Sequence, residues 1–206
     1  MIGTGTRPLT GTDGCDEYFQ ADFADLQQIQ RCADFVRDAE PDILINNAGV
    51  NKIEPFAEID PEDFRRIQQV NVVAPYYLCQ AAIPAMKRKG WGRVVSISSI
   101  WGVVSKEFRA SYSASKFALD GLTLALSHEH AADGILANCV APGFIDTELT
   151  RRVLGDEQIK RLVESVPSRR LGTPEEIARL VVWLGSSENT YLTGQNIAID
   201  GGFSRA

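Results

Sequence analysis

The sequence contains little that could hold a metal ion or form disulfide bonds. Its four cysteines stand alone at positions 15, 32, 79 and 139, and no CxxC pair or other metal-ligand spacing is present. The two histidines, His128 and His130, are two residues apart, a spacing that points them in different directions on a helix. We therefore predict reduced, mostly buried thiols and no metal site.

Long apolar runs and an excess of basic residues are also missing. No apolar run approaches the roughly 18–20 residues of a membrane span, and residues 1–6 have neither the basic nor the apolar region of a signal peptide. The chain has 21 Lys and Arg residues and 27 Asp and Glu residues, so its net charge is −6. These absences predict a cytoplasmic protein with no nucleic-acid or membrane partner.

Strand-like and helix-like segments alternate along the 206 residues without a linker or an internal repeat, which predicts one domain. Short apolar strands are expected at 1–5, 18–21, 43–46, 92–98, 136–141 and 196–199. Amphipathic helices are expected near 25–38, 61–89, 112–132, 156–164 and 174–186. This β-α-β alternation indicates an α/β fold, a doubly wound parallel sheet with helices on both faces. The apolar strand at 43–46 should be covered on both of its faces.

Polar residues follow three of the predicted strands. They are Asn46-Asn47-Ala48-Gly49, Ser98-Ser99 and Pro142-Gly143. Ligands of doubly wound sheets bind beyond the carboxyl ends of the strands. We therefore expect a binding site where these segments converge.

Tyr112 and Lys116 share one face of a predicted helix, because residues at i and i+4 are neighbours. The pKa of a free phenol is near 10, and a nearby ammonium favours the phenolate and lowers that pKa. The pair could act as a general acid and base for a carbonyl or an alcohol. Such pairs also occur by chance on surfaces, but Ser99 ends a strand upstream and could donate a hydrogen bond to a substrate oxygen.

Asn71 interrupts an otherwise apolar helix face. Pro75 follows four residues later and has no N–H, so the Asn71 carbonyl loses its intrahelical partner and the helix should kink. A free carbonyl beside a polar side chain could hold an ordered water. The alternative is a kink without a role in chemistry.

Together these residues form a recognisable set in type, order and spacing. The set is Asn46-Asn47-Ala48-Gly49, Asn71, Ser99, Tyr112, Lys116 and Pro142-Gly143, with the tail motifs Leu171-Gly172-Thr173-Pro174-Glu175-Glu176-Ile177-Ala178, Thr193-Gly194-Gln195 and Asp200-Gly201-Gly202. In this respect the whole chain resembles the short-chain dehydrogenase/reductases. The tail is most similar to the 3-oxoacyl-carrier-protein reductases and their sugar and alcohol relatives.

The resemblance implies a Rossmann-like fold and an oxidoreductase that interconverts a ketone and a secondary alcohol with NAD(P)(H). Tyr112 would exchange a proton with the carbonyl oxygen, and Lys116 would lower the pKa of Tyr112 and hold the nicotinamide ribose. Ser99 would orient the carbonyl, and Asn71 would hold a water that links Lys116 to solvent. Relatives usually assemble as dimers or tetramers through the helices near 61–89 and 112–132 and the C-terminal segment, so a homo-oligomer is expected.

The resemblance also implies cofactor contacts. Asn47, Ala48 and Gly49 would line the ribose side, while Ile145 and Thr147, after Pro142-Gly143, would meet the nicotinamide carboxamide. Asp22 would face the adenine. Arg7 could pair with the 2′-phosphate of NADP(H), which favours NADP(H) over NAD(H), or it could be a solvated loop residue. The sequence does not identify the small-molecule substrate, which the segment 147–170 is expected to cover.

One part of the family pattern has no counterpart. Members usually begin with a strand, a glycine-rich turn and a helix that bind the pyrophosphate, and the glycines within 3–5 and 10–14 do not match that spacing. Residues 1–7 instead resemble the family's second strand. A misassigned start, a naturally short enzyme with altered cofactor binding, and a cofactor-free pseudo-enzyme that keeps the fold for assembly or ligand binding all remain open. We expect exposed backbone groups at the N-terminal edge and weak or no NADPH binding.

Overall fold

The computed structural model describes residues 1–8 and 14–205, so the glycine-containing segment 10–14 lies, except for Gly14, outside the described residues. The strands are β1 (Ile2–Gly5), β2 (Glu17–Gln20), β3 (Ile43–Asn46), β4 (Gly92–Ile97), β5 (Ile135–Pro142) and β6 (Asn196–Ile199). The helices are α1 (Leu26–Ala39), α2 (Pro61–Gln68), α3 (Ala74–Lys89), α4 (Ala110–His130), α5 (Glu148–Glu164) and α6 (Pro174–Gly185). Each strand pair is parallel.

Local sequence signals account for most of these boundaries. Strands β3 and β6 begin and end where they were predicted. Helix α6 begins at a capping box in which the side chains of Thr173 and Glu176 each accept from the other residue's backbone N–H. Helix α5 was expected only from residue 156, but the Thr147 hydroxyl accepts from the Thr150 N–H and starts the helix at Glu148. Much of the expected covering loop is therefore helical.

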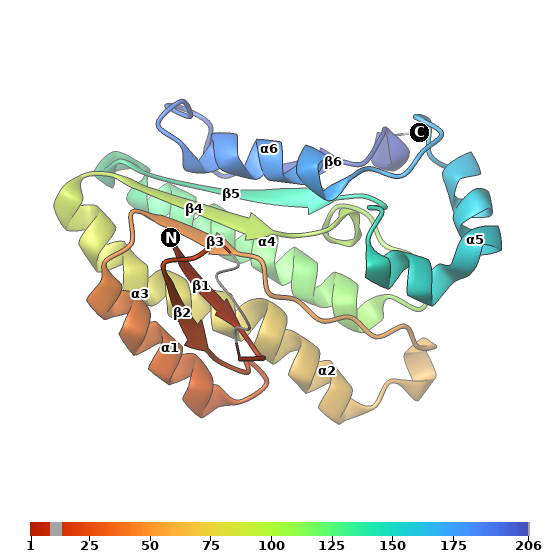
Figure 1. Ribbon diagram of the computed structural model, residues 1–206, viewed down its shortest axis with the longest axis horizontal. Coiled ribbons are helices and arrows are strands. Elements are labelled where there is room, and N and C mark those ends of the chain that lie inside the picture. The colour runs from red at the N-terminus through yellow and green to blue at the C-terminus, as the bar shows by residue number, and fades with distance from the viewer. Residues whose placement is uncertain (9–13, 206) are drawn as a thin grey trace.

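Helices cover both faces of the four-stranded sheet β3-β4-β5-β6. Figure 1 shows α6 above this sheet and α3 and α4 below it, and α6 contacts β3, β4 and β5. Adjacent residues of β4 pack on opposite faces of the sheet. Val94 belongs to the apolar core that includes Leu78 of α3, and Val95 packs with Leu184 of α6. None of the helices in the described part of the chain is both long and apolar enough to span a membrane.

The strands form two sheets, because β1 pairs with β2, whereas β3 pairs with β4. The side chains of Ile43 and Ile45 are 44% and 48% exposed, whereas Leu44 between them is 9% exposed. The expectation that β3 is covered on both faces is therefore wrong. Helix α6 reaches only the start of β3, where a Cβ added at Gly185 would lie 3.3 Å from Ile43 Cγ2.

Helix α1 holds the two-stranded sheet to the rest of the fold. It packs along α3, and its side chains Ile29, Cys32 and Ala33 are buried in the same core as α3. Figure 1 shows β1, β2 and α1 gathered at one side of the larger sheet. The parallel strand directions and the flanking helices agree with the predicted Rossmann-like arrangement, while β1 and β3 each keep one edge that no other described strand pairs.

Candidate active site

The predicted site residues converge at the carboxyl end of β4. Ser99 directly follows that strand and precedes a short 3-10 turn, Ile100–Gly102. Helix α4 begins beside this turn, so Tyr112 lies in its first turn and Lys116 lies one turn later. The predicted grouping of Ser99, Tyr112 and Lys116 is thus present in the structure.

Lys116 is the buried centre of this group. Its side chain is 3% exposed, and its Nζ donates a hydrogen bond to the Ile97 carbonyl at 2.7 Å. The same Nζ lies 5.5 Å from the centre of the Tyr112 ring. Burial lowers the pKa of Lys116 to about 8, because a low-dielectric surrounding disfavours the ammonium form.

The surroundings of Tyr112 change the expected direction of its pKa shift. Burial raises the pKa of Tyr112, while hydrogen bonding with Ser99 and the positive charge of Arg109 act to lower it. The predicted lowering of this pKa by Lys116 is therefore wrong for the protein without a cofactor. Tyr112 keeps its proton at neutral pH and is in the form that a general acid requires.

Asn71 lies in a π-helical turn, Gln69–Val73, between α2 and α3. The Ala74 N–H donates to the Gln69 carbonyl five residues back, and Pro75 has no N–H to offer Asn71. Such turns bend helices and often occur at functional sites. The irregularity stands where the sequence predicted a kink.

The side chain of Asn71 is fully buried and fully bonded. Its Nδ2 donates to the Val50 carbonyl and to Ser115 Oγ, both at 2.9 Å, and its Oδ1 accepts from the Val50 N–H at 2.9 Å. Asn71 thus joins the loop after β3 to α4, next to Lys116. The sequence did not indicate Val50 and Ser115 as its partners, and a water relay would have to use the main-chain carbonyl of Asn71.

The loop after β3 passes over the polar centre of the site. Asn47, Ala48 and Gly49 are exposed, and a Cβ added at Gly49 would lie 3.6 Å from both Asn71 Oδ1 and Lys116 Nζ. A flat group could therefore approach Lys116 across this glycine. This exposed segment is a place where a cofactor could reach the buried ammonium of Lys116.

The segment after β5 lies across the sheet from that loop. A Cβ added at Gly143 would come within 2.7 Å of Asp200 Cα, so only glycine fits against the residues that follow β6. Pro142 ends β5, and Ile145 forms a parallel bridge with Gly172. The Thr147 hydroxyl caps α5.

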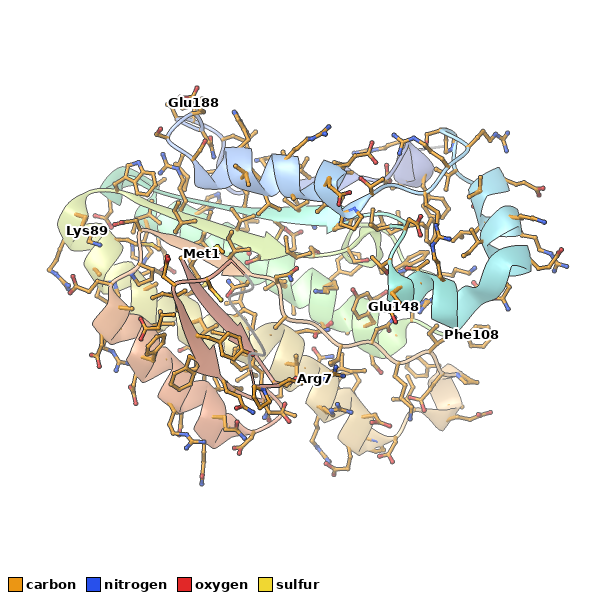
Figure 2. All side chains as sticks on the ribbon, in the orientation of Figure 1. Met1, Arg7, Lys89, Phe108, Glu148 and Glu188 are labelled. Atoms are coloured by element: carbon orange, nitrogen blue, oxygen red, sulfur yellow. The ribbon has the colours of Figure 1, made fainter. Side chains whose placement is uncertain are left out.

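The two residues predicted to contact the adenosine half lie on the separate two-stranded sheet. Arg7 is exposed just beyond the end of β1 (Figure 2), where its carbonyl accepts from the Tyr18 hydroxyl at 2.7 Å. Asp22 is exposed after β2, and its Oδ1 accepts from the Ala24 N–H at 2.9 Å. Both side chains are open to solvent, and the structure does not bring them to the Tyr112 group.

The sequence did not indicate Arg109 as a charged neighbour of Tyr112, nor the packing of its guanidinium on Trp101. Arg109 precedes α4 and lies with its guanidinium carbon 5.9 Å from the centre of the Trp101 ring. Trp101 in turn makes edge-to-face contacts with Phe144 and Phe203. The position of Arg109 three residues before Tyr112 was the available signal, because it places Arg109 at the start of the helical turn that carries Tyr112.

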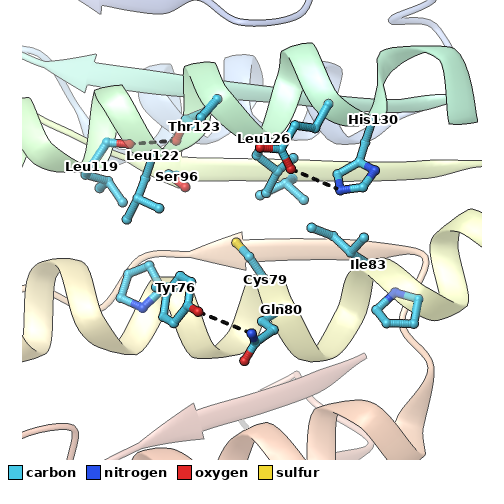
Figure 3. A pocket seen from close by; sticks show the side chains of 15 residues that line it. Tyr76, Cys79, Gln80, Ile83, Ser96, Leu119, Leu122, Thr123, Leu126 and His130 are labelled. Atoms are coloured by element: carbon cyan, nitrogen blue, oxygen red, sulfur yellow. Dashed lines mark hydrogen bonds and ion pairs between the residues drawn. The ribbon is translucent and has the colours of Figure 1, made fainter.

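A separate apolar pocket of about 300 Å³ lies between α3 and α4 (Figure 3). Its walls include Tyr76, Cys79, Leu122 and Leu126, and none of the four predicted catalytic residues lines it. The described residues also contain no cluster of His, Cys, Asp and Glu that could hold a metal ion. The polar site at the end of β4 is therefore distinct from this pocket.

Comparison with known proteins assigns a family. Residues 4–204 match the family model described as Enoyl-(Acyl carrier protein) reductase. A 3-oxoacyl-[acyl-carrier-protein] reductase of Rickettsia bellii is 37% identical over 193 residues, which cover 93% of this chain and 79% of the relative. The chain belongs to the short-chain dehydrogenase/reductase family. By family it is an NAD(P)-dependent oxidoreductase.

Solved short-chain dehydrogenase/reductases share its architecture. A 3-oxoacyl (acyl-carrier-protein) reductase from Agrobacterium tumefaciens with NADP bound is 27% identical, with a TM-score of 0.90 over 97% of this chain and 83% of that one. A gluconate 5-dehydrogenase from Burkholderia cenocepacia, in complex with NADP and tartrate, is 29% identical, with a TM-score of 0.85 over 92% and 76%. The chain thus spans about four fifths of the length of these family members.

Lys116→Met tests how much the buried ammonium costs in stability. The pKa of this lysine falls from 10.5 to about 8 in the folded protein, so the unfolded chain binds more protons between these values. The buried ammonium therefore destabilises the folded protein fully below pH 8, and this destabilisation disappears as the pH rises toward 10.5. We expect Lys116→Met to raise the free energy of unfolding at pH 7 by up to about 3 kcal/mol, with a smaller gain at pH 10.

Urea unfolding at both pH values measures this difference. Lys106→Met is the matched control, because Lys106 is exposed beside Glu107 and an exposed ion pair contributes at most about 1 kcal/mol. A loss of stability in Lys116→Met at pH 7, or a gain that does not change with pH, would show that the buried lysine carries no such cost.

Proposed function

We propose that this protein interconverts a ketone and a secondary alcohol with NADP(H), and that Tyr112 is its general acid and base. The observation that carries the proposal is the meeting of Tyr112, Ser99 and buried Lys116 at the carboxyl end of β4. Relatives named as 3-oxoacyl-[acyl-carrier-protein] reductase and gluconate 5-dehydrogenase support this reaction class. The solved neighbours with NADP bound support the cofactor.

Tyr112 and Ser99 would act on the same substrate oxygen. In reduction, the Ser99 hydroxyl orients the carbonyl, and Tyr112 donates its phenolic proton as negative charge develops on the oxygen. The raised pKa of Tyr112 keeps that proton in place before substrate binds. A bound nicotinamide supplies or accepts the hydride.

Lys116 and Asn71 would return the proton to Tyr112. Lys116, with its pKa near 8, can exchange protons at physiological pH more readily than an exposed lysine. The Asn71 carbonyl has no N–H partner at Pro75 and is available for an ordered water. Because the Asn71 side chain is bound on three sides, it also fixes the loop that would carry the cofactor.

The chain's own residues would hold mainly the nicotinamide half of the cofactor. The proposed contacts are Asn47, Ala48, Gly49, Tyr112, Lys116, Pro142, Gly143, Ile145 and Thr147. Asp22 would face the adenine, and Arg7, exposed at the end of β1, would pair with a 2′-phosphate. That pairing is the basis for proposing NADP(H) rather than NAD(H).

Tyr112→Phe tests the chemistry, because it removes the proton donor and leaves the ring. We expect kcat for the NADPH-dependent reduction of methyl acetoacetate to fall at least about 100-fold, while the Kd for NADPH changes little. Tyr191→Phe, at an exposed tyrosine between α6 and β6, is the control and should keep wild-type turnover. A Tyr112→Phe variant that retains most of its turnover would remove Tyr112 from the mechanism.

Calorimetric titration of the 206-residue chain with NADPH tests the cofactor site. The described residues show no glycine-rich turn at a helix N-terminus, and each missing backbone contact to a charged pyrophosphate is worth roughly 1.5–3 kcal/mol. We expect a Kd weaker than about 100 µM, so turnover should require millimolar NADPH. Micromolar binding would contradict this expectation and would mean that the chain has a rebuilt dinucleotide site.

The alternative function, a cofactor-free protein that keeps the fold for assembly, shares one expected property with the reductase, which is the pairing of copies through α3 and α4. The pocket between α3 and α4 is apolar, and Tyr76 and Phe117 on these helices are 45% and 47% exposed. We infer that two copies pair across this surface whether or not the site is active. Sedimentation should show a dimer or tetramer that Tyr76→Glu dissociates, because the charge cannot be desolvated there. A monomeric wild-type protein would exclude this assembly.

A further inference from the structure

Arg109 is a half-buried arginine that lacks an ion pair within the described parts of the chain. Its guanidinium rests against Trp101, and its side chain does not cap α4. Glu107, the carboxylate that acts on its pKa, is itself paired with Lys106 at 3.5 Å. An arginine partly removed from water without a carboxylate partner has unused capacity to bind an anion.

Arg109 faces the same space as the reacting groups. It is the N-cap residue of α4, where its carbonyl accepts from the Ser113 N–H at 2.7 Å, so Tyr112 follows it within the first helical turn. Its charge acts to lower the pKa of Tyr112. The backbone N–H of Trp101, against whose ring the guanidinium lies, donates to Ser99 Oγ at 3.2 Å. The guanidinium is therefore close to Tyr112 and rests on a residue of the turn that begins at Ser99.

The backbone immediately before Arg109 is strained. Phe108 has a φ of 65°, a left-handed conformation that costs a residue with a bulky side chain roughly 1–2 kcal/mol. Its carbonyl accepts from the Glu54 N–H at 3.3 Å, which ties it to the loop after β3. Such strain is often kept where it aims a functional side chain, and here it sets the direction in which the chain enters α4 at Arg109.

The other basic side chain near this loop is already neutralised. Lys52 pairs with Glu54 at 2.6 Å and with Asp63 at 2.5 Å. These two carboxylates raise its pKa, so Lys52 has little free charge for a ligand. Lys116, the buried cation beside this loop, already donates to the Ile97 carbonyl, so among the described residues Arg109 is the cation without an ion pair that lies outside that buried centre.

We infer that Arg109 determines substrate specificity by binding a carboxylate carried on the ketone substrate. The planar guanidinium fork matches a carboxylate with two parallel hydrogen bonds. Because Arg109 and Tyr112 lie only three residues apart at the start of α4, the carboxylate and the carbonyl at Tyr112 must be separated by few bonds. The substrate class is thus a short oxo acid or its hydroxy acid, and this inference rests on the proposed reductase function.

The test compares three ligands that share the acetoacetyl group: acetoacetate, its methyl ester, and acetoacetyl-CoA, whose phosphates lie many bonds from the ketone. Calorimetric titrations with excess NADP+, which cannot reduce the ketone, are made on wild type, Arg109→Gln, Arg109→Lys and the matched control Arg37→Gln, at an exposed arginine of α1. We expect wild type to bind acetoacetate about 10- to 100-fold more tightly than the ester. Arg109→Gln should bring this ratio close to one, Arg109→Lys should give an intermediate ratio, and Arg37→Gln should keep the wild-type ratio.

Binding and turnover separate this inference from the proposed function. NADPH consumption with a preference that does not depend on Arg109 would overturn the inference and leave the reductase function standing. An Arg109-dependent preference for acetoacetate without NADPH consumption would support the carboxylate site and contradict the reductase function. Equal weakening of all three ligands in Arg109→Gln, or no measurable binding of acetoacetate to wild type, would mean that Arg109 serves only to pack Trp101.

Discussion

The hydrogen bond from Lys116 Nζ to the Ile97 carbonyl is the interaction on which the candidate site depends. It joins the first turns of α4 to the end of β4, so Tyr112 is held beside Ser99 by a contact inside the protein. An ammonium buried to this degree is stable only with a good acceptor nearby. The cost of burial appears as a lowered pKa, and that same change makes Lys116 suitable for moving protons.

Asn71 connects this centre to the loop after β3. A helix through residues 61–89 without interruption would offer only its regular i to i+4 bonds, but Pro75 removes one donor and the helix inserts a π-helical turn there. The Asn71 side chain then bonds to the loop at Val50 and to Ser115 of α4. A local break in one helix is thus compensated by bonds between three elements that surround Lys116.

The same fold leaves one region incompletely covered. Within the described chain, strands β1 and β3 each have an edge that pairs with no strand, and Ile43 and Ile45 lie partly exposed on the face that α6 covers only at the start of β3. Apolar side chains and free strand edges are unfavourable in water. The candidate site is unaffected because its contacts are made by β4, α4 and the π-helical turn, whereas Arg7 and Asp22 lie just beyond the ends of β1 and β2.

The sequence by itself determined the α/β class, the strand and helix order, and the grouping of Ser99, Tyr112 and Lys116, since hydrophobic periodicity and helical spacing are local properties. It also located the break in the helix at Asn71, because the absence of an N–H at Pro75 follows from the covalent structure of proline. Only the tertiary structure decided the protonation of these groups: burial among other elements raises the pKa of Tyr112, against the expectation from its neighbour in sequence. The partners of Asn71, the split of the strands into two sheets and the placement of the Arg109 guanidinium against Trp101 likewise depend on residues distant in the chain, whose approach no local pattern encodes.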